Sequence, residues 1–382
     1  MSSVSRRDVL KLGAIGAAGL IAACNNKSGS PSKLDPNSLK RFESNTSKGS
    51  ATGLAARVAW ASTADSEFFL ALGRGMEQAA TDRHVEYVTA TSGNDPAKHV
   101  EQMNGFLQKG VGALAMQPLN PDADSLVLQR AIDKGVCAQG IITAPSTMQV
   151  VANQYQIGFD QGKAAADYVT AHLGGEAQAI YFNLDTASPQ LKIRHRGVLA
   201  GLKTGGEGIK VVSDLTVADI STTSGFNTMM SALQTHNDIK VVLGGDTIVV
   251  GAFKALKDSG KLTDDMFLSG VDGDREALDL IKAGGAYKQS IAFAWTLMGY
   301  GLGQFGADWI EGKEVPRVLV ANGVNLDSAS AVSRFEAASA DPASVFANRR
   351  KYEEYLPLYG NVSYATRHTY WTSAVDPPKT RA

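Results

Sequence analysis

Residues 57–116 carry the pattern that decides the fold, and they begin with Arg57-Val58-Ala59-Trp60-Ala61-Ser62, a short apolar run typical of a buried strand. Two similar runs follow at Val85–Ala90 and Val111–Met116. The segments between these runs have apolar residues at helical spacing instead. The stretch therefore predicts strand, helix, strand, helix, strand, which is the signature of a parallel sheet covered by helices on both faces.

The two connecting segments carry clear helix signals. Apolar residues at helical spacing give the first helix one buried face: Phe69, Leu72, Met76 and Ala79. Asp95-Pro96 predicts the start of the second helix, because a proline in the first turn needs no amide donor. The buried stripe of that helix is expected to consist of Val100, Met103 and Leu107. Gly110 marks its end.

The same alternation continues through a fourth expected strand, Val136–Ile142, and then restarts. In the second series we expect helices at Gly158–Leu173, Pro189–Lys203, Gly225–His236, Thr247–Ser259 and Glu276–Ala283. Its expected strands are Ala179–Leu184, Val211–Thr216, Val241–Gly244 and Phe267–Val271. Two series of similar length predict an α/β protein with two doubly wound parallel-sheet lobes. Open parallel sheets bind ligands at the carboxyl ends of their strands, so a cleft between the lobes is the expected site.

The N-terminus has the order of features expected of an export signal. Ser5–Lys11 holds the twin arginines, Leu12–Ala23 is apolar, and Ile21–Cys24 is similar to a lipobox. The apolar run is too short to span a bilayer, which takes about 20 residues. We therefore expect residues 1–24 to be a twin-arginine lipoprotein signal and Cys24 to carry lipid. An uncleaved amphipathic N-terminus is the alternative.

The polar segment after this signal predicts a tether. Residues 25–54 are rich in Ser, Asn, Lys, Pro and Gly and cannot bury enough surface to order themselves. The protein is thus expected to be exported and lipid-anchored, in the periplasm or at the cell surface. One other cysteine remains, Cys137, in an apolar stretch where a buried, inert thiol is expected.

Composition and motifs argue against several function classes. The net charge is −1 and no basic stripe occurs, so nucleic acid is not an expected partner. The sequence lacks a phosphate-binding loop, a Gly-x-Ser-x-Gly elbow and histidines at metal spacing, so no cofactor, metal or catalytic residue is expected. An exported enzyme with a cleft site stays open as an alternative, but no constellation favours it.

Six segments, in order and at compatible spacing, resemble the periplasmic sugar-binding proteins of the ribose-binding, type I class. They are Ser66–Phe69, Asn94–Lys98, Gly110–Leu114 with Gln117-Pro118, Ile193–Gly197, Gly245–Ala252 and Gly270–Gly273. The resemblance covers about Arg57 to Leu326. It implies two lobes joined by a multi-strand hinge, the first at 55–157 plus 293–321 and the second at 158–292 plus 322–326. Residues 327–382 would be a C-terminal extension, too aromatic for a disordered tail and expected to pack along a lobe.

The resemblance also implies a set of ligand-binding residues, and sugar chemistry agrees with their types. Aromatic planes suit the C–H faces of a sugar, and charged or amide groups suit its hydroxyls. The implied residues are Phe68, Phe69, Gln117, Arg194, Asp246, Asp272, Phe293 and Trp295. Of the two phenylalanines, one is expected at the ligand and one in the core. Asp246 either contacts the ligand or caps the helix that follows it.

The chain departs from the pattern of this class at several positions. Ile142-Thr143 stands where the class often has Asp-Arg, Gly245 where it has Asn, and Ile220 near its aromatic residue. The site is therefore expected to be more aromatic and less charged, which suits a deoxy sugar, a polyol or a differently oriented ring. Asp160-Gln161 is expected to form hinge or cleft contacts.

The resulting hypothesis is a monomeric receptor that closes on a small sugar or polyol and delivers it to the membrane permease of an ATP-driven (ABC) importer. Two alternatives share the fold: a ligand sensor for a chemoreceptor or kinase, and a receptor for a furanosyl signalling molecule. Sugar-responsive repressors also share it. They carry a helix-turn-helix at the N-terminus, where this chain has the export signal, so that interpretation is rejected.

Overall fold

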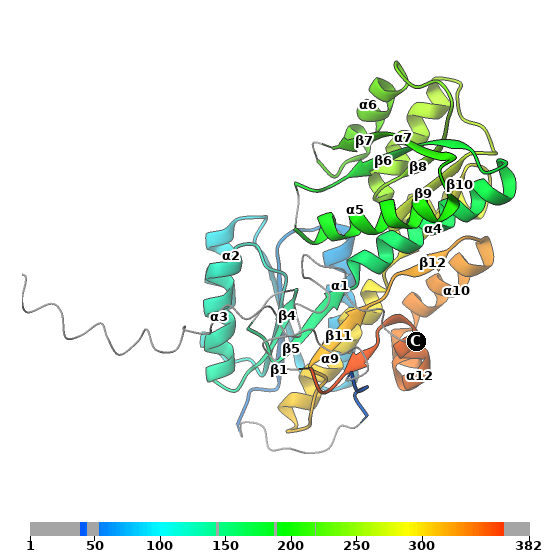
Figure 1. Ribbon diagram of the computed structural model, residues 1–382. Coiled ribbons are helices and arrows are strands. Elements are labelled where there is room, and N and C mark those ends of the chain that lie inside the picture. The colour runs from blue at the N-terminus through cyan, green and yellow to red at the C-terminus, as the bar shows by residue number, and fades with distance from the viewer. Residues whose placement is uncertain (1–38, 44–52, 143–144, 187–188, 218, 363–382) are drawn as a thin grey trace, which may run out of the picture. The chain divides into compact units, whose positions relative to one another are not determined.

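The computed structural model describes residues 39–43, 53–142, 145–186, 189–217 and 219–362, and these lie within one compact unit of the chain, Pro36–Ala382 (Figure 1). The predicted signal with Cys24, most of the tether and residues 363–382 lie outside the described residues. Two sheets organise the unit. We call the parts built on them the first lobe and the second lobe.

The first lobe is built on a seven-stranded sheet in the order β13-β11-β5-β4-β3-β1-β2. Its strands are β1 (Arg57–Ser62), β2 (Glu86–Thr91), β3 (Ala113–Met116), β4 (Cys137–Ile141), β5 (Met148–Ala152), β11 (Val318–Ala321) and β13 (Leu358–Tyr359). Neighbouring strands pair in parallel from β2 to β11, and only β13 runs antiparallel to its neighbour.

The second lobe is built on a six-stranded sheet in the order β12-β10-β9-β8-β6-β7. Its strands are β6 (Ala177–Asn183), β7 (Ile209–Thr216), β8 (Ile239–Leu243), β9 (Phe267–Asp272), β10 (Tyr287–Ala292) and β12 (Val324–Leu326). All pairs are parallel except β10 with β12. The predicted fold class, two lobes of mostly parallel sheet with flanking helices, is thus confirmed, with one antiparallel edge strand added to each sheet.

The helices follow the predicted alternation. They are α1 (Glu67–Asp82), α2 (Pro96–Lys109), α3 (Pro121–Asp133), α4 (Gln154–His172), α5 (Pro189–Leu202), the short 3-10 helix Lys203–Gly205, α6 (Thr222–Ala232), α7 (Asp246–Asp258), α8 (Arg275–Ala283), α9 (Trp295–Ile310), α10 (Ala329–Ala340), α11 (Pro342–Ala347) and α12 (Arg349–Tyr355). Asp95 caps α2 by accepting from the amides of Ala97 (2.9 Å) and Lys98 (3.1 Å), and Gly110 ends it with φ 83°. Both predicted ends of this helix are confirmed.

Two helix pairs pack so closely that only glycine fits between them. A Cβ at Gly158 of α4 would overlap the carbonyl oxygen of Arg194 in α5, and one at Gly299 of α9 would overlap that of Leu72 in α1. This close approach fixes α5 against α4 and α9 against α1. It thereby positions Arg194 in the second lobe and Trp295, the first residue of α9, in the first.

The structure describes the C-terminal extension as far as residue 362. Its helices α10 to α12 follow β12, and β13 then joins the edge of the first-lobe sheet (Figure 1). The N-terminal segment lies beside that strand. The amide of Phe42 donates to the carbonyl of Leu358 (2.9 Å), and Arg41 forms an isolated antiparallel β-bridge with Tyr359. The two ends of the described chain therefore meet at one sheet edge.

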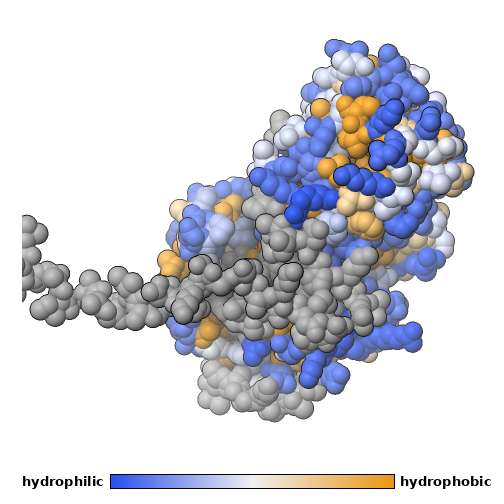
Figure 2. Space-filling model, viewed as in Figure 1, coloured by the Kyte–Doolittle hydropathy of each residue, from blue (hydrophilic) through white to orange (hydrophobic). Residues whose placement is uncertain are grey.

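Surface and core agree with a water-exposed α/β protein. Figure 2 shows apolar side chains among polar ones over the part of the second lobe that holds α6 and β7, where Met230 and Val211 are exposed. In the described part of the chain, no helix combines the length and the apolar character that crossing a bilayer requires. Cys137 is fully buried, and burial raises the pKa of its thiol to about 12, so the prediction of a buried, inert thiol is confirmed.

Candidate functional site

Four of the predicted aromatic residues form one continuous cluster in the first lobe. Phe68 and Phe69 lie in the first turn of α1, just past β1, while Phe293 directly follows β10 and Trp295 is the first residue of α9. The ring of Trp295 contacts those of Phe68 (4.5 Å between centroids) and Phe293 (4.6 Å). Phe69 instead stacks on the buried Trp60 (6.4 Å), so it faces the core and Phe68 faces the strand end.

A cavity of about 450 Å³ lies beside this cluster. Phe293 and Trp295 line it together with Gly273 and residues of α1 and α10, among them Phe335. Phe293 is only 3% exposed, and Trp295 is partly exposed. The three aromatic rings give the cavity one apolar side, as stacking on a small ring requires, while Glu67, Arg74 and Gln78 of α1 give it a polar side.

Arg194 is anchored at the point where the chain passes from the first lobe to the second. It is 8% exposed, and its Nε donates to Oε1 of Gln154 (2.8 Å). Gln154 is the first residue of α4, directly after the cap residue Asn153, whose Oδ1 accepts from the amide of Gln156 (3.2 Å). One side of the guanidinium is thus fixed, and its other N–H groups remain to be used by a ligand.

Asp272 ends β9 in a conformation that amino acids with side chains rarely adopt. Its φ is 119°, and Gly273 follows with φ 82°. Burial raises the pKa of the Asp272 carboxyl to about 7, although the positive charge of Arg194 acts in the opposite direction. Among the described residues, no hydrogen bond to this carboxylate is found. A strained residue with an unused charged group is a common feature of functional sites.

Asp246 is placed differently from the sequence-based expectation. It is fully buried at the start of α7, and the N-cap position belongs to Gly245. Its Oδ2 accepts from the amides of Gly273 (2.7 Å) and Asp274 (2.9 Å). Tyr287 Oη (2.8 Å, to Oδ1) and Ser290 Oγ (2.6 Å, to Oδ2) also donate to it. The expectation that it points into an open cleft is wrong, because four internal donors occupy both oxygens, and it does not cap its own helix either.

The remaining predicted positions lie at other strand ends of the first lobe. Gln117 follows β3, and its Oε1 is buried without a partner among the described residues. Its carbonyl oxygen is in contact with Nε2 of His99 (3.1 Å). Ile142, directly after β4, has φ 64°, an outlier for a β-branched residue. Thr143 lies outside the described residues.

The expected hinge or cleft role of Asp160-Gln161 is wrong. Gln161 is fully buried within the second lobe, where its Nε2 donates to the carbonyls of Gly244 (3.0 Å) and Ser269 (2.9 Å). It ties α4 to the ends of β8 and β9. Asp160 is exposed on α4 and accepts from Gln156 (2.6 Å).

Sequence reasoning missed a charged cluster next to Arg194. His195 is largely buried between two carboxylates, with Nδ1 3.1 Å from Asp185 and Nε2 2.6 Å from Asp214. Asp214 is also held by Nδ2 of Asn183 (2.6 Å). The available signal was the position of the two acidic residues, which lie at or near the ends of β6 and β7.

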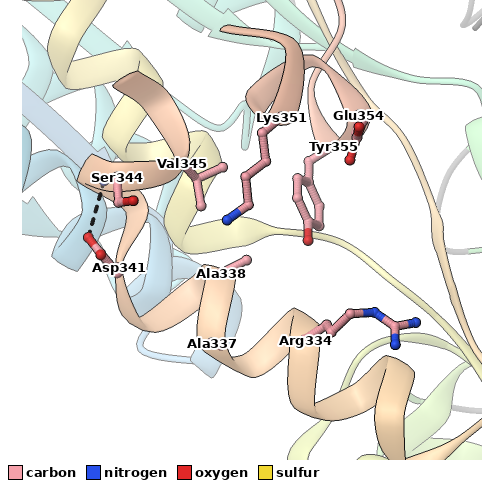
Figure 3. A pocket seen from close by; sticks show the side chains of 9 residues that line it. All are labelled: Arg334, Ala337, Ala338, Asp341, Ser344, Val345, Lys351, Glu354 and Tyr355. Atoms are coloured by element: carbon pink, nitrogen blue, oxygen red, sulfur yellow. Dashed lines mark hydrogen bonds between the residues drawn. The ribbon is translucent and has the colours of Figure 1, made fainter. Parts of the chain in front are cut away.

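A second cavity, of about 370 Å³, lies among α10, α11 and α12, and none of the predicted site residues lines it (Figure 3). Lys351 and Tyr355 point into it from α12. Within the described ranges, no group of three or more His, Cys, Asp and Glu side chains could hold a metal ion. The aromatic cluster with Arg194 and Asp272 is therefore the candidate site.

Comparison with known proteins points to one family. Residues 57–314 match the family described as periplasmic binding protein domain. The chain is similar to the ribose import binding protein of Bacillus subtilis, with 28% identity over 68% of this chain and 83% of that protein. Two solved structures share the fold. One is a solute-binding protein of Bacillus halodurans with bound myo-inositol (19% identity, 75% and 99% covered, TM-score 0.62). The other is a twin-arginine translocation pathway signal protein of Burkholderia phytofirmans (18%, 81% and 99%, TM-score 0.65).

Proposed function

Because this chain belongs to the periplasmic binding protein domain family, we propose that it is a receptor for a small sugar or polyol, bound where the strand ends of its two lobes face a common ligand. This family consists of solute-binding receptors, not enzymes, in line with the lack of a catalytic constellation in the sequence. The receptor delivers its ligand to the membrane permease of an ABC importer.

The proposal rests on one observation: the two lobes supply different kinds of side chain. The first lobe supplies an aromatic wall, Phe68 with Trp295 and Phe293, for the C–H face of a ring. The second lobe supplies Arg194, a multiple donor, and Asp272, an acceptor. A polyhydroxylated ring needs both kinds of surface, and only a ligand between them uses both. Binding therefore favours the closed arrangement of the lobes.

The ligand class follows from what the first lobe lacks. At the end of β4 the chain has Ile142, an apolar side chain in a strained conformation, instead of a charged pair. Fewer charged contacts on this side favour a ligand with fewer hydroxyls there, such as a deoxy sugar, or a polyol bound in a different orientation. Gln117, whose Oε1 has no partner among the described residues, is the polar contact we propose for the first lobe.

A thermal-shift and calorimetry screen tests this function. Purified protein is titrated with D-ribose, myo-inositol, deoxy sugars and linear polyols. A compound at 100 times its dissociation constant adds about 2.7 kcal/mol of stability, or about 3–5 °C in melting temperature for a chain of this size. A screen in which no sugar or polyol shifts the melting temperature, while amino acids or organic acids do, would refute the proposed ligand class.

We further propose a lipid anchor at Cys24 and export by the twin-arginine route, on the basis of the N-terminal sequence. Stable anchoring takes more than one acyl chain, which a lipidated N-terminal cysteine provides. Cys24→Ser should move the protein from the membrane fraction to the soluble fraction. Replacement of Arg6 and Arg7 by Lys should leave an unprocessed precursor in the cell, whereas normal processing would indicate the general secretory route.

A further inference from the structure

We propose that the C-terminal extension is part of the binding machinery: Phe335 of α10 positions the turn that carries Asp272 and forms one wall of the cavity beside Phe293 and Trp295. The inference rests on the proposed function, since it gives the extension a role at that same site. It concerns a segment beyond residues 57–314, the range that matches the family.

The extension starts next to the candidate site. β12 pairs antiparallel with β10, with Val324 opposite Ala292, the residue before Phe293. From β12 the chain enters α10, which packs against both α8 and α9. Phe335 is 7% exposed and lines the 450 Å³ cavity together with Phe293 and Trp295.

The ring of Phe335 lies directly against the strained turn. Its Cε1 is 3.8 Å from the position that a Cβ on Gly273 would occupy, and the side chain of Ala292 in β10 is nearer still, at 2.6 Å. On another side, the amides of Gly273 and Asp274 donate to the buried carboxylate of Asp246. Strained backbone conformations such as that of Asp272 persist only where the surroundings enforce them. Asp246, Phe335 and Ala292, which pairs with Asp272 in the sheet, are among the surroundings that hold this turn.

The helix that carries Phe335 is itself fixed to both lobes. The neighbouring Glu336 forms an ion pair with Lys282 of α8 in the second lobe (2.9 Å). Phe335 also contacts Tyr355 of α12 (6.5 Å between ring centroids), and Figure 3 shows Tyr355 pointing from α12 toward α10. α12 is held to the first lobe by the fully buried Tyr352, whose hydroxyl donates to the carbonyl of Leu297 in α9 (3.5 Å).

These contacts connect the start of the helix that holds Trp295 with the turn that holds Asp272. The extension thus connects the aromatic residues of the first lobe with the turn that carries Asp272 in the second. It contributes no polar contact to the ligand. Removal of the ring at Phe335 should free the turn, so that the Asp272 carboxylate spends less time in its binding orientation.

Hydrogen exchange of the unliganded protein tests this inference without any ligand. In Phe335→Ala, the amides of Gly273 and Asp274 should exchange about 10-fold faster or more than in the wild type. Phe346→Ala is the matched control, because this ring packs in the same extension against Phe305 (5.5 Å) and Tyr352 (4.9 Å), away from the turn. Equal exchange at these two amides in both variants would overturn the proposal.

Calorimetry with D-ribose and myo-inositol provides the second readout. Phe335→Ala should weaken binding about 3- to 10-fold, and Phe335→Leu, which keeps an apolar side chain of similar length, should restore most of the affinity. In an Asp272→Ala background, Phe335→Ala should cause no further loss. An additive loss would contradict a positioning role. If neither compound binds the wild type, calorimetry uses the sugar or polyol that the screen identifies, and the exchange rates decide the role of Phe335 in either case.

Discussion

The ends of two neighbouring strands, β8 and β9, carry the same kind of side chain in two different states. Asp246, just past β8, is fully buried, and four donors of the second lobe occupy its oxygens. Asp272, at the end of β9, is partly exposed on a strained backbone, and no hydrogen bond to its carboxylate is found within the described ranges. A carboxylate at a strand end is therefore available to a ligand only where its neighbours leave its oxygens unused.

The largest effect should come from removing the carboxylate of Asp246, whose oxygens accept hydrogen bonds from within the second lobe. Asp246→Ala leaves the buried hydroxyls of Tyr287 and Ser290 without their acceptor, and hydrogen bonds to charged groups contribute about 1.5–3 kcal/mol each. We expect the free energy of unfolding, measured in urea, to fall by about 3 kcal/mol or more. Asp272→Ala should not lower it, because the buried ionised carboxylate that it removes is itself unfavourable in the folded state. Equal losses in the two variants would erase the distinction between the two strand ends.

The second effect concerns affinity for the ligand, and here we expect the loss in the Asp272 variant. Asp272→Ala and Arg194→Ala should each remove a charge-assisted hydrogen bond to the sugar or polyol identified by screening. A loss of about 1.5–3 kcal/mol weakens binding about 10- to 150-fold, as titration calorimetry would measure. Asp160→Ala, an exposed acidic residue on α4, serves as the control and should bind normally. Unchanged affinity in both site variants would show that the site lies elsewhere.

The third effect is a dependence of stability on pH. Burial raises the pKa of Asp272 to about 7 and that of Asp246 to about 6, above the value of about 3.9 for an unfolded Asp. The folded state therefore binds these protons more tightly. The resulting stabilisation is fully present below about pH 4 and is lost as the pH rises through 6 and 7.

Urea denaturation at several pH values measures this dependence. From pH 5 to pH 8 the free energy of unfolding should fall, by at most about 1.4 kcal/mol per pH unit for each carboxyl. Asp272→Asn should abolish most of the slope between pH 6 and pH 7 and roughly halve it below pH 6, where Asp246 still contributes. A wild-type curve that rises over this range would contradict the raised pKa values.

The smallest effect should come from a substitution that gives the Asp272 carboxylate a hydrogen-bond donor, as the Asp246 carboxylate already has. A Cβ on Gly245 would meet only Oδ2 of Asp272, at 3.9 Å, and φ at this position is −79°, so a side chain fits without strain. Gly245→Asn places an amide beside that carboxylate and improves the N-cap of α7 by a few tenths of a kcal/mol. The melting temperature should rise by about 1 °C. A marked decrease would show that the space beside Asp272 is smaller than described.

Sequence patterns predicted the alternation of strands and helices well, because local signals dominate there. β1 has the bounds Arg57–Ser62 that the apolar run predicted, and the cap at Asp95 starts α2. α4 begins at Gln154, four residues before the predicted Gly158, because the cap residue Asn153 was not recognised. Boundaries set by a single side chain are easily missed even where the helix itself is plain.

The site was only partly predictable, because its decisive contacts link distant segments. The aromatic cluster and Arg194 were named from short motifs. Tyr287 and Ser290, whose hydroxyls donate to Asp246, lie more than 40 positions from it along the chain. No local sequence pattern reveals hydrogen bonds of this kind. Phe335 lies beyond the range of the resemblance, so only the folded chain shows its contact with the turn.

The first-lobe sheet can be completed only late in synthesis, because its edge strand β13 follows β11 at a distance along the chain. The edge of β11 is covered by β13, and Arg41, near the start of the chain, bridges Tyr359, near its end. A growing chain thus carries an unpaired edge at β11 until β13 has left the ribosome, and such edges invite wrong pairing. A transport route that accepts only finished molecules, as the twin-arginine signal suggests, would suit a chain with this late closure.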